Sequence, residues 1–380
     1  MKVLIFNEFY YPNIKGGAEI STQLLAEQLV KMNVDVSVCT LSDNGHTESI
    51  NGVNVYYMKY RNLYWEFSYQ NPSTFKRLAW HLIDSNNVLM YKPIIDVIKK
   101  VKPDIIHTNN ICGFSTIIWS IAHKLNIPVI HTLRDYYLMC PKTTMFNNDK
   151  ECITQCKKCA LCSSFHKRNS KYVDAVVGIS KFILNKHLEN NYFQNAIKKQ
   201  VIYNPVDIQC DTSKVHDEKK IGFLGTLAPH KGIEYLLKNF ISLGNKDYQL
   251  VIGGTGNPKY LTYLKNKYSY SNVHFLGRVE SKSFLSSIGM LVVPSLWNEP
   301  FGRVVAEGQT CGCVVTTSNK GGLPELIEDK RLVFSIDNDC ELQNILLSYM
   351  NKSEMFTSKK CHDFTTLGNA QSYYDIYKCL

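Results

Sequence analysis

The stretch from Pro294 to Glu307 constrains the fold more than any other part of the sequence. It follows an apolar run, Met290 to Val293, that is typical of a buried strand, and it leads into a helical segment from Val304 to Thr310. The loop between them carries Pro300 and Gly302. A strand, a glycine-containing loop and a helix start bring free backbone N–H groups and the positive end of the helix dipole to one place. We therefore expect an anion-binding site in this loop.

Two carboxylates lie in the same stretch, Glu299 and Glu307, eight positions apart. Carboxylates repel a bare phosphate, but they accept hydrogen bonds from hydroxyl groups. The combination favours a ligand in which a phosphate is flanked by hydroxyl groups, as in a nucleotide sugar.

At these residues the chain resembles glycosyltransferase family 4, the retaining nucleotide-sugar-dependent enzymes that carry a Glu-x7-Glu motif on a GT-B fold. The resemblance implies an α/β protein of two doubly wound Rossmann-like domains facing across a cleft. It implies that Glu299 binds a donor-sugar hydroxyl, that Glu307 binds the ribose hydroxyls, and that no catalytic metal is needed. The donor-binding residues implied around the helix start are Phe301, Gly302, Arg303, Val304 and Glu307.

A second motif supports the same resemblance. The run from Gly225 to Gly232 is similar to the family's Gly-Arg-x4-Lys-Gly segment, in which Arg and Lys grip the donor pyrophosphate. Lys231 matches the lysine, so the resemblance implies that it stabilises the leaving pyrophosphate. Thr226 stands where the family has arginine, and we expect Arg303 or Arg278 to supply the missing charge. The run Gly321 to Glu325 resembles the family's Gly-Gly-x-x-Glu loop.

The first half of the chain begins with an apolar strand, Lys2 to Asn7, and a periodic helix from Ile20 to Lys31. Gly16 and Gly17 precede the helix, where glycine lets backbone amides approach a ligand closely. The alternative is a plain turn, and the pattern is not the Gly-x-Gly-x-x-Gly of a dinucleotide site. The family resemblance places this pair near the donor phosphate.

Polar residues follow two further predicted strands of this half. His107 ends the run from Pro103, and Asn109 comes just after it. The run from Ile127 to Leu133 is followed by Arg134 and Asp135, and the family commonly has a histidine at the position of Arg134. Ligands of open parallel sheets meet the carboxyl ends of strands. We expect His107, Asn109 and Asp135 to line the acceptor side, and Arg134 to hold a phosphate or the acceptor.

Five cysteines fall between residues 140 and 162, inside an expected insertion at about 140–165. Thiolates at such spacing suit a structural zinc ion, and the alternatives are an iron–sulfur cluster or reduced, unligated thiols. The expected zinc ligands are Cys152, Cys156, Cys159 and Cys162. By contrast, we interpret Asp337 to Asp339 as a helix cap and not as a metal site.

The chain length and the cysteine count predict the domain organisation and the cellular compartment. A chain of 380 residues predicts two domains, here 1–204 and 205–365, with a terminal helix at 366–380 that crosses back to the first. The odd count of 13 cysteines and the absence of a signal-peptide pattern favour a reducing cytoplasm.

Charge and aromatic residues indicate the partners. Residues 1–203 hold 24 Lys and Arg against 15 Asp and Glu. The segment 53–80 interleaves aromatic residues with Lys and Arg, which favours an anionic membrane surface, although ordinary core packing is the alternative. No nucleic-acid-binding signature is present.

Together these features predict a glycosyltransferase that moves a sugar from a UDP- or GDP-sugar to a lipid-linked or oligosaccharide acceptor. It would work in surface polysaccharide synthesis, peripherally on the inner face of the cell membrane. Two other functions stay open at this point. One is a nucleotide-sugar epimerase of the same fold, and the other is a non-catalytic nucleotide-sugar-binding protein.

Overall fold

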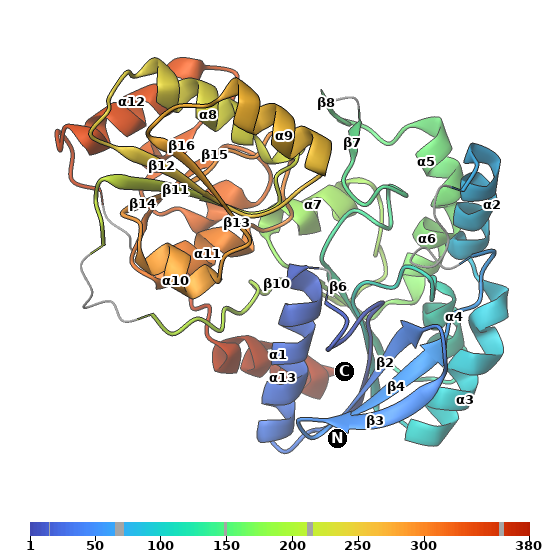
Figure 1. Cartoon of the computed structure of the whole chain (residues 1–380). Coiled ribbons are helices and arrows are strands. Elements are labelled where there is room, and N and C mark those ends of the chain that lie inside the picture. The colour runs from blue at the N-terminus through green and yellow to red at the C-terminus, as the bar shows by residue number, and fades with distance from the viewer. Residues whose placement is uncertain (15, 65–71, 148–149, 211–215, 357–360) are drawn as a thin grey trace. The chain divides into compact units, whose positions relative to one another are not determined.

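The structure is a computed structural model that describes residues 1–14, 16–64, 72–147, 150–210, 216–356 and 361–380. The chain divides into two compact units (Figure 1). The first comprises Met1–Met145, Cys152–Pro205 and Phe364–Leu380, and the second comprises Phe146–Glu151 and Val206–Asp363. From the sequence we expected a boundary after residue 204 and a terminal helix that belongs with the first domain. The inclusion of Phe146–Glu151 in the second unit was not expected.

The first unit is built on an eight-stranded sheet with the order β10-β9-β6-β5-β1-β2-β4-β3. The strand pairs are parallel except at one edge, where β3 and β4 form an antiparallel hairpin. Buried parallel strands read as continuous apolar runs, which is why most of them were predictable. The strands are β1 (Lys2–Phe6), β2 (Asp35–Ser42), β3 (His46–Ile50), β4 (Val53–Lys59), β5 (Ile105–Thr108), β6 (Val129–Leu133), β9 (Ala175–Gly178) and β10 (Lys198–Val201).

Helices pack on both faces of this sheet, with α1 and α13 side by side on one face and α3 and α4 on the other (Figure 1). The α-helices of the first unit are α1 (Gly17–Lys31), α2 (Thr74–Ser85), α3 (Tyr91–Val101), α4 (Ile117–Lys124), α5 (Lys157–Cys162), α6 (Ser164–Asn169), α7 (Lys181–Glu189) and α13 (Thr366–Cys379). Short 3-10 turns, η1 (Val88–Met90) and η2 (Ser170–Tyr172), follow α2 and α6.

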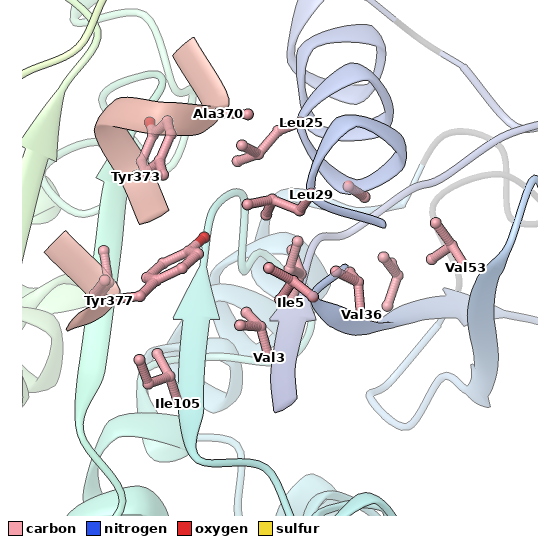
Figure 2. Close-up of a cluster of buried hydrophobic side chains, with 14 of the residues drawn as sticks. Val3, Ile5, Leu25, Leu29, Val36, Val53, Ile105, Ala370, Tyr373 and Tyr377 are labelled. Atoms are coloured by element: carbon pink, nitrogen blue, oxygen red, sulfur yellow. The ribbon is translucent and has the colours of Figure 1, made fainter. Parts of the chain in front are cut away.

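A hydrophobic cluster joins α13 to the first sheet. Figure 2 shows side chains from β1, α1 and α13 pointing into one shared core. Fully buried members include Ile5, Leu29, Tyr373 and Tyr377. Burying one such side chain stabilises the fold by about 1.5–3 kcal/mol. Helix α13, although it follows the whole of the second unit in the chain, is therefore an integral part of the first.

The second unit contains a six-stranded sheet with the order β13-β12-β11-β14-β15-β16, whose strand pairs are all parallel. The strands are β11 (Lys220–Leu224), β12 (Gln249–Gly253), β13 (Val273–Gly277), β14 (Met290–Val293), β15 (Val314–Ser318) and β16 (Val333–Phe334). The α-helices are α8 (Ile233–Ser242), α9 (Pro258–Lys267), α10 (Ser281–Ser286), α11 (Arg303–Thr310) and α12 (Asp339–Met350). Three 3-10 turns complete it: η3 (Pro229–Lys231), η4 (Leu323–Leu326) and η5 (Lys330–Leu332). A small hairpin, β7 (Phe146–Asn147) and β8 (Lys150–Glu151), also belongs to this unit.

Local capping explains two helix starts. Helix α1 begins one turn before the apolar periodicity does, because the Glu19 carboxylate accepts a 2.8 Å hydrogen bond from the N–H of Gly16. The Asn338 side chain accepts from the N–H of Cys340 at 3.2 Å, which confirms the prediction that Asp337 to Asp339 caps a helix.

One pair of cysteines differs from the prediction that all thiols are reduced. Cys210 and Cys311, 101 positions apart, form a disulfide, where we expected reduced thiols only. No local pattern pointed to this pair, because it is the fold that brings the segment after Pro205 beside the end of α11. In the described part of the chain no helix is long and apolar enough to cross a membrane.

Candidate active site

The centre of the candidate site in the second unit is an ion pair between Lys231 and Glu299. The Lys231 Nζ lies 2.9 Å from the Glu299 Oε1, and the Ser295 hydroxyl donates to the same oxygen. The Lys231 ammonium also lies 5.3 Å from the centre of the Trp297 ring. Lys231 ends the turn η3, and the other three residues belong to the loop after β14. Two loops at the carboxyl ends of neighbouring strands thus meet at one charged pair.

Glu299 is held in its ionised form. Burial raises the pKa of the Glu299 carboxyl, but the charge of Lys231 and hydrogen bonds from Ser295 and Lys231 outweigh it, so the pKa lies below its ordinary value. Burial and the charge of Lys231 likewise lower the pKa of the neighbouring His230. The site therefore presents a fixed carboxylate and a fixed ammonium, with a neutral imidazole beside them at pH 7.

The second predicted carboxylate lies on the helix that follows. Glu307 is buried on α11, and its Oε1 accepts from the Arg303 Nε at 2.6 Å. Helix α11 begins at Arg303 after Gly302, which adopts the left-handed conformation with φ of 105°. A glycine at this point lets the chain turn sharply into the helix, whose N-terminus carries the positive end of the helix dipole.

The loop that carries Glu299 is braced by the Gly-Gly segment. The N–H of Gly321 donates to the Asn298 Oδ1 at 2.9 Å, and the N–H of Gly322 donates to the carbonyl of Glu299 at 2.7 Å. Gly321 has φ of 62°, and a Cβ atom there would collide with the backbone of Glu299. The glycine is therefore required both for its conformation and for the close approach of the two loops.

A contact that the sequence did not predict comes from β8. The Glu151 carboxylate accepts a hydrogen bond from the Asn298 Nδ2 and lies 3.8 Å from the Lys320 Nζ. On the same hairpin, the Phe146 ring centre lies 6.2 Å from that of His230. Phe146 and Glu151, which lie in an interruption of the first unit in the chain, thus contact His230 of the turn η3 and the loop that holds Glu299, respectively.

The remaining predicted donor residues occupy different environments. Phe301 is buried, whereas Thr226 is exposed in the loop after β11. Val304 is half-buried in the first turn of α11. Arg303 is engaged with Glu307, and Arg278 is exposed after β13. Of the two cations proposed to replace the arginine lost at Thr226, Arg303 is the one that pairs with a carboxylate of the Glu-x7-Glu motif, from the first turn of α11.

A cavity of about 430 Å³ opens in the first unit, beside the start of α1. The predicted residues Gly16, Gly17 and Asp135 line it together. Its lining comprises Glu8, Gly16, Gly17, Ala18, Glu19, His81, Asn110, Cys112, Asp135, Tyr137, Pro141, Lys142 and Thr143. Glu8 and Glu19 were missed, although Glu19 follows the predicted Gly-Gly pair closely and its charge at a helix start was a usable signal.

Asp135 has unusual electrostatics within this cavity. Burial raises its pKa to about 6, in spite of the hydrogen bond that its Oδ1 accepts from the N–H of Tyr137 at 2.8 Å. A carboxyl group with such a pKa exchanges its proton near neutral pH. It can donate a hydrogen bond when protonated and accept one when ionised.

Three predicted residues of the first unit lie away from the cavity lining. His107 is fully buried, with Nδ1 2.7 Å from the Tyr377 hydroxyl and Nε2 2.8 Å from the Thr132 hydroxyl, and burial and then Arg134 lower its pKa to about 3. Arg134 is buried too, and it donates to Asn109 Oδ1 at 2.9 Å and Asn204 Oδ1 at 2.7 Å. His107 is thus a hydrogen-bonded core histidine and not a cavity residue, because α13 covers the ring. Arg134 and Asn109 instead form a polar cluster with Asn204.

The cysteine-rich segment brings some thiols together. The Sγ atoms of Cys159 and Cys140 are 4.0 Å apart, and the Cys156 Sγ caps α5 by accepting from the N–H of Cys159 at 3.5 Å. Cys140 was not among the expected ligands, yet its Sγ atom lies close to that of Cys159, which was. Among the described residues, however, no three His, Cys, Asp or Glu side chains are arranged to hold a metal ion.

Comparison with known proteins decides the family. Residues 15–209 match the family described as Glycosyltransferase Family 4, and residues 208–367 match Glycosyl transferases group 1. The chain belongs to glycosyltransferase family 4.

This glycosyltransferase is 37% identical over 330 residues to an "uncharacterized 42.6 kDa protein in cps region" of Klebsiella pneumoniae, covering 86% of this chain and 87% of that one. It is 28% identical over 360 residues to an "uncharacterized glycosyltransferase" of Methanocaldococcus jannaschii, covering 86% and 83%. A human phosphatidylinositol N-acetylglucosaminyltransferase chain is 23% identical over 355 residues, covering 89% and 67%.

The fold of this glycosyltransferase agrees with solved structures. Anabaena HepE in complex with UDP and glucose superposes with a TM-score of 0.69 at 17% identity, over the whole of both chains. Sucrose-phosphate synthase from Thermosynechococcus elongatus superposes with a TM-score of 0.74 at 17% identity, over 100% of this chain and 98% of that one. The two Rossmann-like units are those of the GT-B fold.

Proposed function

We propose that this glycosyltransferase transfers a sugar from a nucleotide-sugar donor to a lipid-linked saccharide, with retention of the anomeric configuration, in the synthesis of a surface polysaccharide. The observation that carries the proposal is the partly buried Lys231–Glu299 pair in the loop that precedes α11. Such a pair offers a cation for a leaving pyrophosphate and a carboxylate for a sugar hydroxyl within one small site.

Each site residue of the second unit has a distinct role in this proposal. Lys231 stabilises the negative charge that develops on the leaving phosphate, together with the N–H groups at the start of α11. Glu299 orients the sugar by accepting from one of its hydroxyls. Glu307 accepts from the ribose hydroxyls, and Arg303 keeps its carboxylate in place. The proposal needs no catalytic metal, because the lysine and the helix N-terminus supply the positive charge.

The relatives support the kind of donor and acceptor. The Klebsiella relative comes from a cps region, the human relative is named for transfer to phosphatidylinositol, and the HepE structure contains UDP and glucose. A UDP-sugar is thus the first donor to test, with a GDP-sugar as the second. With a lipid-linked saccharide acceptor, the enzyme would work peripherally on the inner face of the cell membrane. In the cavity of the first unit, Asp135 is proposed to contact the acceptor, and Gly16 and Gly17 keep their expected role at the donor phosphate.

A structural zinc ion in the cysteine-rich segment stays a separate proposal. The described thiols do not stand in a metal-binding arrangement, so no step of the proposed reaction depends on zinc. The close approach of Cys140 and Cys159 supports testing Cys140 beside the four expected ligands. Metal analysis of the purified protein tests the proposal, with about one zinc ion per chain expected.

The experiment that tests the proposed function is a donor panel followed by a transfer assay. Thermal shifts are measured with UDP, GDP, ADP, CDP and their sugars, on wild type and on Glu307→Ala. A ligand at about 100 times its dissociation constant stabilises by about 2.7 kcal/mol, so binding is visible as a raised melting temperature. We expect one nucleotide to raise it and the variant to lose the shift.

The transfer assay then distinguishes the functions. NMR of the product reports whether the anomeric configuration is retained. An altered donor sugar formed without any acceptor would identify an epimerase instead. Binding of a donor with no turnover on any saccharide acceptor would identify a non-catalytic protein, and the absence of every nucleotide shift would overturn the proposal.

A further inference from the structure

Helix α2 of the first unit carries apolar side chains on the side that faces solvent. Phe75 is 82% exposed, Leu78 39% and Leu82 41%. Their spacing of three and four residues places them on one side of the helix, over two turns. The other side of α2 is already packed, because Trp80 and Asp84 are buried. The exposed stripe is therefore additional to the apolar contacts that hold the helix in the fold.

The helices that pack against α2 also expose apolar side chains. Both α5 and α6 contact α2, and each exposes an apolar side chain: Leu161 on α5 is 58% exposed, and Phe165 on α6 is 41% exposed. Val88 and Leu89, in the turn η1 after α2, are exposed as well. We call the exposed residues of α2, α5 and α6 the apolar stripe. It consists of Phe75, Leu78, Leu82, Leu161 and Phe165.

The segments that carry the apolar stripe are rich in positive charge. Residues 153–172 contain neither Asp nor Glu, and their basic residues are exposed. These exposed cations are Lys157, Lys158, Lys167, Arg168 and Lys171. Helix α2 adds Lys76 and Arg77, and its one acid, Asp84, is buried and accepts from the Tyr137 hydroxyl at 2.5 Å and the N–H of Gly113 at 2.8 Å. Apart from Asp84, helix α2 and residues 153–172 carry no carboxylate side chain, so these segments form a basic surface.

We infer that the apolar stripe and the surrounding cations of α2, α5 and α6 form a docking surface for an anionic lipid bilayer. Apolar side chains enter the acyl boundary of a bilayer, while Lys and Arg remain at the headgroup level and pair with anionic lipids. This inference deepens the proposed function and rests on it for the membrane-borne acceptor. It keeps Phe75, Lys76 and Arg77 from the segment 53–80 and leaves the rest of that segment out. Tyr57 and Trp80 are buried, and Trp65, Phe67 and Tyr69 lie outside the described residues.

The charge pattern selects a lipid surface over a protein partner. An interface between proteins is depleted of lysine in its core. Here pairs of adjacent cations, Lys157 with Lys158 and Lys167 with Arg168, lie on the same short helices as Leu161 and Phe165. That mixture suits a fluid surface of negative headgroups, in which each cation finds a partner without a fixed geometry.

Vesicle co-sedimentation of the full chain tests the inference. Vesicles of phosphatidylcholine alone are compared with vesicles that contain about 30% phosphatidylglycerol, at low and at physiological salt. One variant carries Phe75→Ser, Leu78→Ser and Leu161→Ser, and a second carries Lys157→Glu, Lys158→Glu and Arg168→Glu. The matched control carries Ile197→Ser, Lys198→Glu and Lys199→Glu, which change one exposed apolar residue and two exposed lysines elsewhere on the same unit.

We expect wild type and the control to bind the anionic vesicles, and each test variant to lose about tenfold in bound fraction. Thermal melts check that every variant is folded. Equal binding by the test variants and wild type would overturn the inference, as would binding that does not depend on phosphatidylglycerol. Concentration-dependent association of the free protein that the test variants abolish would identify a second copy of the chain as the occupant instead.

The proposed function is tested separately with a water-soluble saccharide acceptor. Transfer to that acceptor does not require a membrane, so we expect the test variants to keep wild-type rates on it. A failure of vesicle binding with intact transfer overturns the docking surface alone. A failure of transfer with intact vesicle binding overturns the proposed reaction alone.

Discussion

The carboxylates of the two units are held in opposite ways. In the second unit, Glu299 and Glu307 each face a cation, at 2.9 and 2.6 Å, and the pKa of Glu299 lies below its ordinary value. In the first unit, burial raises the pKa of Asp135 to about 6. The difference teaches that the second unit is prepared for a ligand with fixed charges. In the cavity of the first unit, by contrast, the Asp135 carboxyl changes its charge near pH 6.

The largest expected effect comes from breaking the pair in the second unit. Glu299→Ala removes the carboxylate that positions Lys231 and the sugar, so we expect the turnover number for sugar transfer to fall by about 10²–10³-fold. The matched control is Glu234→Ala, which breaks an exposed pair with Lys267 outside the site. Steady-state kinetics with the donor found by the panel measure both. A loss below tenfold for Glu299→Ala would contradict the role of Glu299.

A second change displaces the Glu299 loop without touching its charges. Gly321→Ala places a Cβ atom against the Glu299 backbone, and a misplacement of about 1 Å costs roughly 10²-fold in rate. Gly244→Ala is the control, because Gly244 has a similar φ of 64° and, among the described residues, no atom within 4 Å of the added carbon.

Both alanine variants share a conformational cost of about 1–2 kcal/mol in the free energy of unfolding. Only Gly321→Ala should lose transfer activity, which kinetics together with thermal melts will show. Equal activity of the two variants would mean that the close approach of the loops is not needed.

A smaller effect is expected at the ribose end of the site. Glu307→Gln keeps the shape of the side chain but weakens its acceptance of ribose hydroxyls, so the dissociation constant of the donor should rise about tenfold, or 1.4 kcal/mol. The turnover number at saturating donor should change little, because the proposed role of Glu307 is to bind the ribose and not the transferred sugar. Isothermal titration measures the affinity, and an unchanged dissociation constant would remove Glu307 from the donor site.

The smallest effect is a pH dependence in the first unit. The ordinary pKa of Asp135 is 3.8 and its pKa in the folded protein is about 6, so the folded state binds the proton more tightly than the unfolded state. Stability contributed by this group is therefore fully present below the ordinary pKa and is lost as the pH rises through the pKa of the folded state. Asp135→Asn should remove that loss. Melting temperatures of both proteins across this pH range measure it, and parallel curves would refute the assignment.

Local patterns carried most of the fold and the charged centre of the site. Apolar runs predicted β1, β6 and β14, and the Glu-x7-Glu stretch predicted the loop before α11. The hairpin of β3 with β4 was not predicted, because most residues of β3 are exposed and carry no apolar run. Glu151 is 147 positions from its partner Asn298, and no local pattern encodes such a contact.

His107 illustrates the remaining limit of local patterns. Its place at the end of a strand was predicted correctly, yet Tyr377, 270 positions later, covers its ring. The position in a strand predicts where the backbone of a residue lies, whereas tertiary packing decides which groups its side chain contacts. The same holds for Arg134, whose amide partners Asn109 and Asn204 come from two other parts of the chain.

The position of α13 in the core of the first unit has a consequence for how the protein is made. A ribosome adds about 5–20 residues per second, and domains generally fold as they emerge. Here Tyr373 and Tyr377 are synthesised after all of the second unit, so the first sheet to emerge is the last to close its core. Until then the apolar side chains of Ile5 and Leu29 lack the contacts that α13 provides in the folded protein.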